Sequence, residues 1–287
     1  MRWRCCHRCP VGTAEVKALV LNFFDRYAVR QRAGGPRLRF GVAWFVCLMA
    51  VLLSGSFAVT VLFAVAAGVA ALQTAGAWRS RKVKVNQAVA GSGAALMTLA
   101  AWHGNRAVGV ALLIVVVAAV LLGADTKIDR TTLGRGSFTR ERLSSHLPIA
   151  SATLRSCLFV GLAGAATVQV HRTDPMSFLY LVSVACVYDS GDYLVGSGSR
   201  RRIVGTIAGL IGVVVVVLAM TAIQPAPLKV DSDVRWLGLA MGLACPLGQL
   251  LASWTLPNAR AKAPALRRLD SWLITAPACL VGLWILT

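Results

Sequence analysis

Long uncharged stretches alternate with short polar connections along this chain of 287 residues. The first stretch, from Phe40 to Trp78, holds 39 residues without a charged side chain. At about 1.5 Å per residue, one helix of that length would far exceed a bilayer core of about 30 Å. We therefore expect two helices here, with Gly55 and Ser56 forming the turn between them.

We then searched the rest of the chain for uncharged stretches of about 17 to 22 residues, the length that spans a bilayer. Together with the first two, they predict nine membrane-spanning helices. The fifth contains Arg155 near one end, where a long cationic side chain can reach the interface. The sixth is short, because its apolar part ends against Asp189. The sequence thus predicts an all-α, polytopic integral membrane protein with helices near 40–55, 57–78, 85–102, 107–124, 154–170, 174–190, 203–223, 236–254 and 272–286.

The composition agrees with this fold class. Hydrophobic residues make up 57% of the chain and charged residues 14%, whereas a soluble domain averages about 25% charged residues. The charges are too few to cover a surface that faces water, and the hydrophobicity is too high for a disordered chain. Both alternatives are therefore excluded.

The distribution of charge predicts an orientation. The chain carries 30 Lys and Arg against 11 Asp and Glu, a formal net charge of +19. In a soluble protein such an excess would suggest nucleic-acid binding, but 26 of the 30 cations lie in the N-terminal tail and in alternate connections. Short cationic connections remain cytoplasmic. We expect a cytoplasmic N-terminus, an external C-terminus, a multi-pass location in the cell membrane and no nucleic-acid partner.

Residues 1–39 form a basic tail on the cytoplasmic side of the first helix. The tail lacks the short apolar core and cleavage site of a secretory signal, and its arginines favour contact with anionic lipid head groups. Cys5, Cys6, His7 and Cys9 could ligate zinc, but such sites normally need a second, separated ligand pair, and none follows. The role of this cluster stays open.

Polar residues gather where three of the predicted helices meet the cytoplasmic interface. Ionisable groups at such places are costly and tend to be functional. Carboxylates would hold magnesium there, and arginines would bind phosphate oxygens. The alternative is that Asp189 and Asp270 only form salt bridges with neighbouring arginines. The three segments are Tyr188-Asp189-Ser190-Gly191-Asp192-Tyr193 with Gly196 and Arg200-Arg201-Arg202, then Gly248, Gln249 and Ser253 after Pro246, and finally Arg267-Arg268-Leu269-Asp270-Ser271.

Four motifs in these segments resemble those of phosphatidate cytidylyltransferases, also called CDP-diacylglycerol synthases. The stretch from Asp189 to Gly196 resembles "D-x-G-A-Y-F-x-G", and Gly205 to Gly209 resembles "E-G-x-I-G-G". GQLLAS, from Gly248 to Ser253, is similar to "G-D-L-x-E-S", and Arg268-Leu269-Asp270-Ser271 is similar to "D-R-x-D-S". The resemblance covers roughly residues 184 to 283. It divides the chain into the tail (1–39), N-terminal transmembrane helices with a cytoplasmic loop (40–153) and a cytidylyltransferase-like transmembrane domain (154–287).

The resemblance implies an enzyme of phospholipid biosynthesis that joins CTP to phosphatidate with Mg²⁺ and releases pyrophosphate. Asp189 and Asp270 would be metal or nucleotide ligands. Arg268 would contact phosphates, and Ser253 and Ser271 would be supporting hydrogen-bonding groups. Further residues that would bind substrate or phosphate are Arg200, Arg201, Arg202 and Tyr193.

The chain also departs from the family pattern. Val204, Gln249 and Ala252 stand where the family has carboxylates, and Arg267 replaces the first aspartate of the last motif. Three interpretations follow: an active, divergent cytidylyltransferase; a catalytically silent paralogue that binds lipid or a partner; or a transporter. A transporter should carry polar groups at mid-bilayer on helices broken by glycine or proline. The sequence leaves the lipid substrate and the oligomeric state open, including a homodimer.

Close packing is expected for the seventh helix. Gly205, Gly209 and Gly212 follow at spacings of four and three, which places them on one helix face. Small residues in this arrangement let neighbouring membrane helices approach closely. They predict packing and carry no chemistry of their own.

Overall fold

The computed structural model describes residues 37–123, 140–197, 203–224, 227–228, 230–258 and 261–287. The predictions made for Cys5, Cys6, His7 and Cys9, and for the three arginines at 200–202, lie outside these residues.

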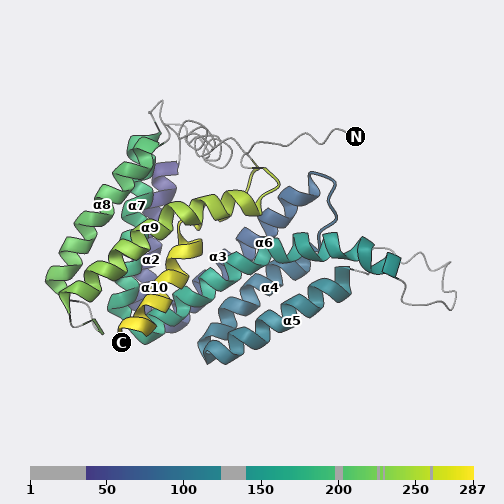
Figure 1. The fold of residues 1–287 in the computed structure, drawn as a ribbon, viewed down its shortest axis with the longest axis horizontal. Coiled ribbons are helices and arrows are strands. Elements are labelled where there is room, and N and C mark those ends of the chain that lie inside the picture. Colours follow the sequence, from purple (N-terminus) through teal and green to yellow (C-terminus); the bar gives the residue numbers. More distant parts are fainter. Residues whose placement is uncertain (1–36, 124–139, 198–202, 225–226, 229, 259–260) are drawn as a thin grey trace, which may run out of the picture.

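The described residues form nine α-helices (Figure 1), which confirms the all-α fold class. Six of them are long and apolar enough to cross a membrane, judged by length and composition: α3, α5, α6, α7, α8 and α9. A multi-pass membrane protein is therefore indicated. The bounds are α2 (Arg37–Ser54), α3 (Ser56–Arg79), α4 (Gln87–Ala100), α5 (Asn105–Gly123), α6 (Arg140–Thr173), α7 (Pro175–Gly196), α8 (Ile203–Ile223), α9 (Asp231–Thr255) and α10 (Trp272–Leu286), with short 3₁₀ turns η1 (Ala101–His103) and η3 (Leu266–Arg268).

Each of the nine predicted ranges coincides with one of these helices, but two boundaries were wrong. Helix α6 begins at Arg140 instead of near 154, because a helix can continue past its apolar part and hydropathy does not detect that extension. Helix α7 continues to Gly196 instead of ending against Asp189. Its carboxylates find partners inside the bundle, so they do not end the helix.

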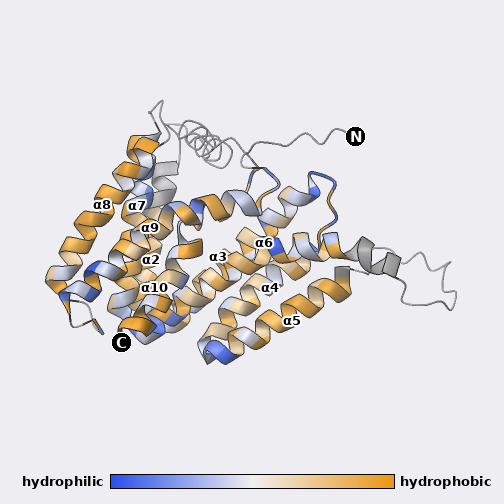
Figure 2. Ribbon diagram, in the orientation of Figure 1, coloured by the Kyte–Doolittle hydropathy of each residue, from blue (hydrophilic) through white to orange (hydrophobic). Residues whose placement is uncertain are grey.

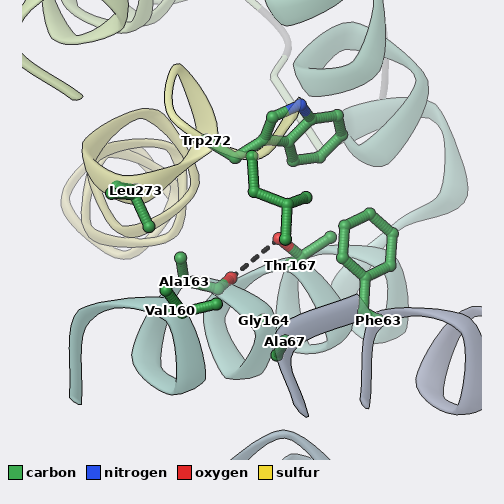
Figure 3. Close-up of a pocket in the computed structure, with 9 residues that line it drawn as sticks. Phe63, Ala67, Val160, Ala163, Gly164, Thr167, Trp272 and Leu273 are labelled. Atoms are coloured by element: carbon green, nitrogen blue, oxygen red, sulfur yellow. Dashed lines mark hydrogen bonds between the residues drawn. The ribbon is translucent and has the colours of Figure 1, made fainter. Parts of the chain in front are cut away.

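The helices pack as two groups (Figure 1). Helices α3, α4, α5 and α6 contact one another, as do α7, α8, α9 and α10, while α6 packs against α10 across the middle. Phe63 and Trp272 meet there with ring centroids 5.2 Å apart. Figure 3 shows how these rings close over Ala67 and Gly164, leaving a cavity of about 10 Å³. This interface is packed core with no room for a ligand.

Glycines bring α7 and α8 into backbone contact. A Cβ built on Gly191 would lie 2.8 Å from the Cα of Gly209, and one on Gly209 would lie 2.8 Å from the carbonyl oxygen of Tyr188. One turn further, Gly196 and Gly205 approach in the same way. The predicted close packing of this helix face is confirmed.

One end of the bundle is marked by an arginine between two tryptophans. The Arg155 guanidinium lies 3.9 Å from the ring centroid of Trp254 and 5.3 Å from that of Trp78. It also donates to the Trp254 carbonyl, while Trp78 Nε1 donates to the carbonyl of Thr255 at 2.9 Å. These contacts join α3, α6 and α9 at what we call the Arg155 end.

A similar group marks the opposite, Arg172 end. Arg172 lies 5.5 Å from the ring centroid of Trp102, which also packs edge-on against Phe57. Arg155 and Arg172 are 17 residues apart on α6, or about 26 Å at the helical rise. That separation is close to a bilayer core of about 30 Å, at whose two interfaces tryptophans concentrate.

The outward faces between these ends are apolar. Figure 2 shows hydrophobic residues along α5 and α8, the outermost helices on opposite sides of the bundle. Leu113 on α5 and Ile211 on α8 are 64% and 62% exposed. In water such surfaces would be unfavourable, whereas lipid solvates them.

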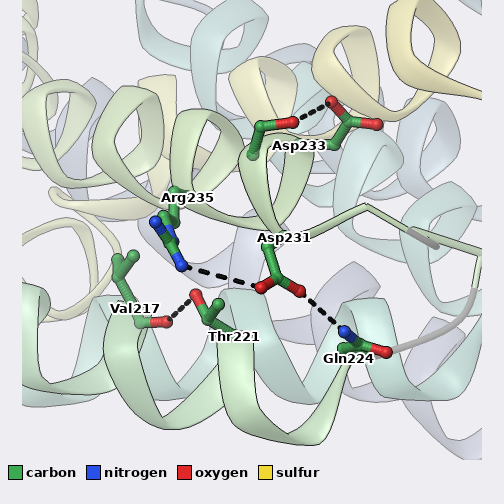
Figure 4. Close-up of polar contacts among 7 residues, drawn as sticks. Val217, Thr221, Gln224, Asp231, Asp233 and Arg235 are labelled. Atoms are coloured by element: carbon green, nitrogen blue, oxygen red, sulfur yellow. Dashed lines mark hydrogen bonds and ion pairs between the residues drawn. The ribbon is translucent and has the colours of Figure 1, made fainter.

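Polar contacts close the α8–α9 hairpin at the Arg172 end (Figure 4). The Gln224 amide donates to Asp231 at 2.6 Å, and Arg235 pairs with the same carboxylate at 3.6 Å. Asp231 also lies in the first turn of α9, where a negative charge favours the helix. The hairpin thus starts α9 on the opposite side from the Arg155 end.

The glycine contact gives a testable prediction. Gly209→Ala should lower the free energy of unfolding in detergent by about 1–3 kcal/mol, because the new methyl group meets the Tyr188 backbone, which cannot move aside cheaply. Gly109→Ala is the matched control, since nothing lies within 4 Å of its Cβ position. It should leave the melting temperature unchanged or raise it. Equal destabilisation by the two variants would contradict the close approach of α7 and α8.

Candidate functional site

The chain folds back into the bundle between α9 and α10. A Cβ on Gly248 would overlap the carbonyl oxygen of Asp270 and lie 2.9 Å from that of Ser271. Gly248 precedes the end of α9 at Thr255 by seven residues, or about 10 Å along the helix. The returning segment therefore places Asp270 and Ser271 inside the bundle, about 10 Å from the Arg155 end of α9.

Ser271 joins the two predicted carboxylates. Its hydroxyl donates to Oδ2 of Asp189 on α7 at 3.0 Å, and its backbone N–H donates to Oδ1 of Asp270 at 2.9 Å. Ser271 is fully buried and Asp270 is 7% exposed. Residues 81 positions apart in the sequence therefore meet at one serine.

A second polar layer lies beside this pair. Gln249 on α9 donates from Nε2 to Oδ2 of Asp192 at 3.2 Å, and its Oε1 accepts from the Tyr188 hydroxyl at 3.3 Å. Asp192 follows Asp189 by one helical turn, so both carboxylates lie on the same face of α7. We call Asp189, Asp192, Gln249, Asp270 and Ser271 the Ser271 cluster.

Two arginines of η3 supply positive charge to the cluster. Arg267 donates from Nη1 to the Ser253 hydroxyl at 2.9 Å and interacts electrostatically with Asp270. Arg268 interacts in the same way with Asp189. Each carboxylate that contacts Ser271 thus has a guanidinium in its neighbourhood.

Burial controls the protonation of Asp270, which lies outside the helices. It raises the pKa of this carboxyl to about 7, and the positive charge of Arg267 opposes the rise. The same burial lowers the pKa of Arg267, and Asp270 opposes that shift. Burial therefore favours the neutral form of the Asp270 carboxyl, and a further cation nearby would favour the charged one.

The structure places the predicted site residues as follows. Asp189, Asp270 and Ser271 are in contact, while Ser253 and Arg268 lie beside them. Tyr193 is half-buried one turn beyond Asp189, and within the described part of the chain its side chain makes no hydrogen bond to the cluster. The three arginines at 200–202 are not described.

Sequence analysis did not include Asp192 or Gln249 among the site residues. The spacing of three from Asp189 could have identified Asp192, because residues i and i+3 share a helix face. Gln249 was noted in the second polar segment and as a departure from a family motif, without a role in the site. Its role depends on the tertiary contact with Asp192, which no local pattern reveals.

The described residues offer a metal ion at most a pair of carboxylates. The described residues contain no group of three or more His, Cys, Asp or Glu side chains that could hold a metal. Mg²⁺, however, is usually bound by one or two carboxylates, with phosphate oxygens and water completing its shell. Asp189 and Asp270 could supply such a pair.

All four motifs that carry the family resemblance meet at this cluster. Asp189 and Asp192 come from the first, and Gly205 and Gly209 of the second pack against that part of α7. Gln249 and Ser253 come from the third, and Arg268, Asp270 and Ser271 from the fourth. No protein-family model matches the chain, and no curated protein matches it.

The contacts of Gln249 give a second prediction. Gln249→Leu should cost about 1–3 kcal/mol of unfolding free energy, because it leaves the Tyr188 hydroxyl and the Asp192 carboxylate without this partner. Gln169→Leu is the control, since the half-buried Gln169 side chain makes no hydrogen bond to any described residue. Melting temperatures in detergent measure both. If Gln249→Leu melts no lower than Gln169→Leu, the bridge contributes nothing.

Proposed function

We propose that the chain is a membrane nucleotidyltransferase of the phosphatidate cytidylyltransferase type, which converts CTP and phosphatidate into CDP-diacylglycerol and pyrophosphate. The convergence of four separated motifs on one buried cluster around Ser271 carries this proposal. Chance matches scattered over about 100 residues would not be expected to gather around one cluster.

In the proposed reaction an oxygen of the lipid phosphate attacks the α-phosphorus of CTP. A new P–O bond forms as the bond to the β-phosphate bridging oxygen breaks, and pyrophosphate leaves with that electron pair. A bound Mg²⁺ ion, held by Asp189 and Asp270, would neutralise phosphate charge. Arg268 contacts a phosphate, and Ser271 holds the two carboxylates side by side. Catalysis of this kind depends mainly on positioning and charge.

The proposal includes an orientation. All nine helices cross the cell membrane, and the Arg155 end faces the cytoplasm, where CTP is available. The charge distribution supports this, because 26 of the 30 cations belong to the tail and to alternate connections. Arg79, Arg81, Lys82 and Lys84 leave the bundle at the Arg155 end, whereas Arg106 begins α5 at the other.

A non-catalytic paralogue that binds lipid or a partner is the second candidate. The position of Arg267 favours it, because a guanidinium near Asp270 supplies positive charge where a metal would act. Gln249 also favours the non-catalytic paralogue, because its amide donates a hydrogen bond to the Asp192 carboxylate, which would otherwise be available to a metal. Asp270 and Ser271 lie about 10 Å from the Arg155 end, near the middle of the roughly 26 Å between Arg155 and Arg172, so their depth does not distinguish the transferase from a transporter. Release of pyrophosphate does.

Cysteine labelling tests the orientation. Ser232→Cys, at the start of α9, should react with an impermeant thiol reagent in intact cells, because this connection is external in the proposed topology. Ser137→Cys should react only after the cells are opened, and the unsubstituted protein gives the background from native cysteines. The opposite result, with only Ser137→Cys labelled in intact cells, would reverse the orientation.

Pyrophosphate release tests the activity. Purified protein in detergent should release pyrophosphate when supplied with CTP, Mg²⁺ and phosphatidate. Asp270→Asn should reduce the rate at least about a hundredfold, because the amide has the same shape but no charge to hold a cation. Arg268→Ala should cost about tenfold to a hundredfold through the lost phosphate contact. Arg106→Ala, at the Arg172 end, should have no effect.

Nucleotide binding separates the two candidates. A ligand at a hundredfold excess over its Kd stabilises a protein by about 2.7 kcal/mol, so CTP bound with Mg²⁺ should raise the melting temperature visibly. No pyrophosphate with any lipid phosphate, together with an unchanged melting temperature at millimolar CTP and Mg²⁺, would exclude the transferase and leave the non-catalytic paralogue.

A further inference from the structure

A separate hollow opens at the Arg155 end, between the last turns of α3 and the segment that follows α9. Its volume is about 510 Å³, within the range of small-molecule sites. The polar groups around it come from both walls: Gln73, Ser80 and Arg81 on one side, Asn258 and Lys262 on the other. None of these five residues belongs to the Ser271 cluster.

The walls of the hollow are fixed to each other. The Gln73 side chain accepts a hydrogen bond from the backbone N–H of Ala265 at 2.8 Å, and Trp78 donates to the Thr255 carbonyl at 2.9 Å. The bond to Ala265 joins α3 to the end of the returning segment. The bond to Thr255 joins α3 to the end of α9. The hollow is therefore formed before any ligand enters.

Its charge is positive and uncompensated. Arg81 and Lys262 are exposed, and within the described residues no carboxylate forms an ion pair with either of them. A cationic hollow of this kind suits an anion.

The position of the hollow identifies the class of anion. In the proposed membrane orientation, Trp78 and Trp254 lie at the level where tryptophans meet lipid head groups, and Arg81 follows Trp78 by three residues. Basic pockets between membrane helices at this level bind anionic head groups. We propose that the hollow between α3 and the wall formed by Pro257, Asn258, Ala261 and Lys262 binds a phosphate group, either on the head group of an anionic lipid or as free phosphate.

The experiment uses the full chain in uncharged detergent and follows its melting temperature with dioctanoyl phosphatidylglycerol. This lipid carries a phosphodiester, so it is not a substrate of the proposed transferase. It should stabilise the unsubstituted protein, and Arg81→Gln/Lys262→Gln should weaken its apparent affinity about tenfold or more. Ala261→Trp should weaken binding without changing charge, because the ring fills the hollow. Lys84→Gln removes a cation from the same connection outside the hollow and should bind normally.

Two further measurements show whether the phosphate comes from a lipid head group or from the free ion, and whether the hollow binds independently of the Ser271 cluster. Stabilisation by inorganic phosphate at the same concentration would assign the site to the free ion, and stabilisation by the lipid alone would assign it to the head group. Asp270→Asn should bind phosphatidylglycerol as the unsubstituted protein does. Should the double variant aggregate, Arg81→Gln and Lys262→Gln are tested singly, and each must weaken binding. Unchanged affinity in these variants, or equal stabilisation by dioctanoyl phosphatidylcholine, would overturn the proposal.

Discussion

Burying carboxylates among apolar helices is the constraint around which this bundle is built. A charged group removed from water costs several kcal/mol unless donors and opposite charges surround it. Asp189 and Asp270 meet that requirement through Ser271, and the arginines of η3 reduce the cost further. None of these partners is local to α7, so the chain must bring them from elsewhere in the sequence.

Several features of the backbone follow from that requirement. The segment after α9 must return into the bundle to deliver Asp270 and Ser271, and Gly248 leaves the space for it to pass. Helix α10 then starts part-way through the bundle and has only 15 residues, about 22 Å, to reach the other end. The tight glycine contacts hold α8 against the part of α7 that carries the carboxylates. A short last helix is thus a consequence of the buried site.

Most of the helices could be predicted from the sequence, but only some of the residues of the Ser271 cluster could. Apolar length predicted all nine helices, because solvation by lipid leaves a strong local signal. It failed at the end of α7, where the helix continues through polar residues whose partners lie on other elements. It also failed at the start of α6, where the helix extends beyond its apolar part. The motifs identified Asp189, Asp270 and Ser271, yet the contact between Gln249 and Asp192 is tertiary. No periodicity in either helix encodes which residue faces which across the bundle.

Charge balance shows how the two sites at this end differ. The cluster brings together three carboxylates, of Asp189, Asp192 and Asp270, with the guanidinium groups of Arg267 and Arg268. With all five groups ionised, one net negative charge would remain, and a divalent cation nearby would favour that charged form. A divalent cation entering with the nucleotide reverses the sign, so the proposed transferase needs metal and nucleotide together. The hollow beside α3 holds two cations and no described carboxylate, so it can accept a phosphate without a metal. The two proposed phosphate sites would therefore bind different molecules, because only one of them would depend on a metal ion.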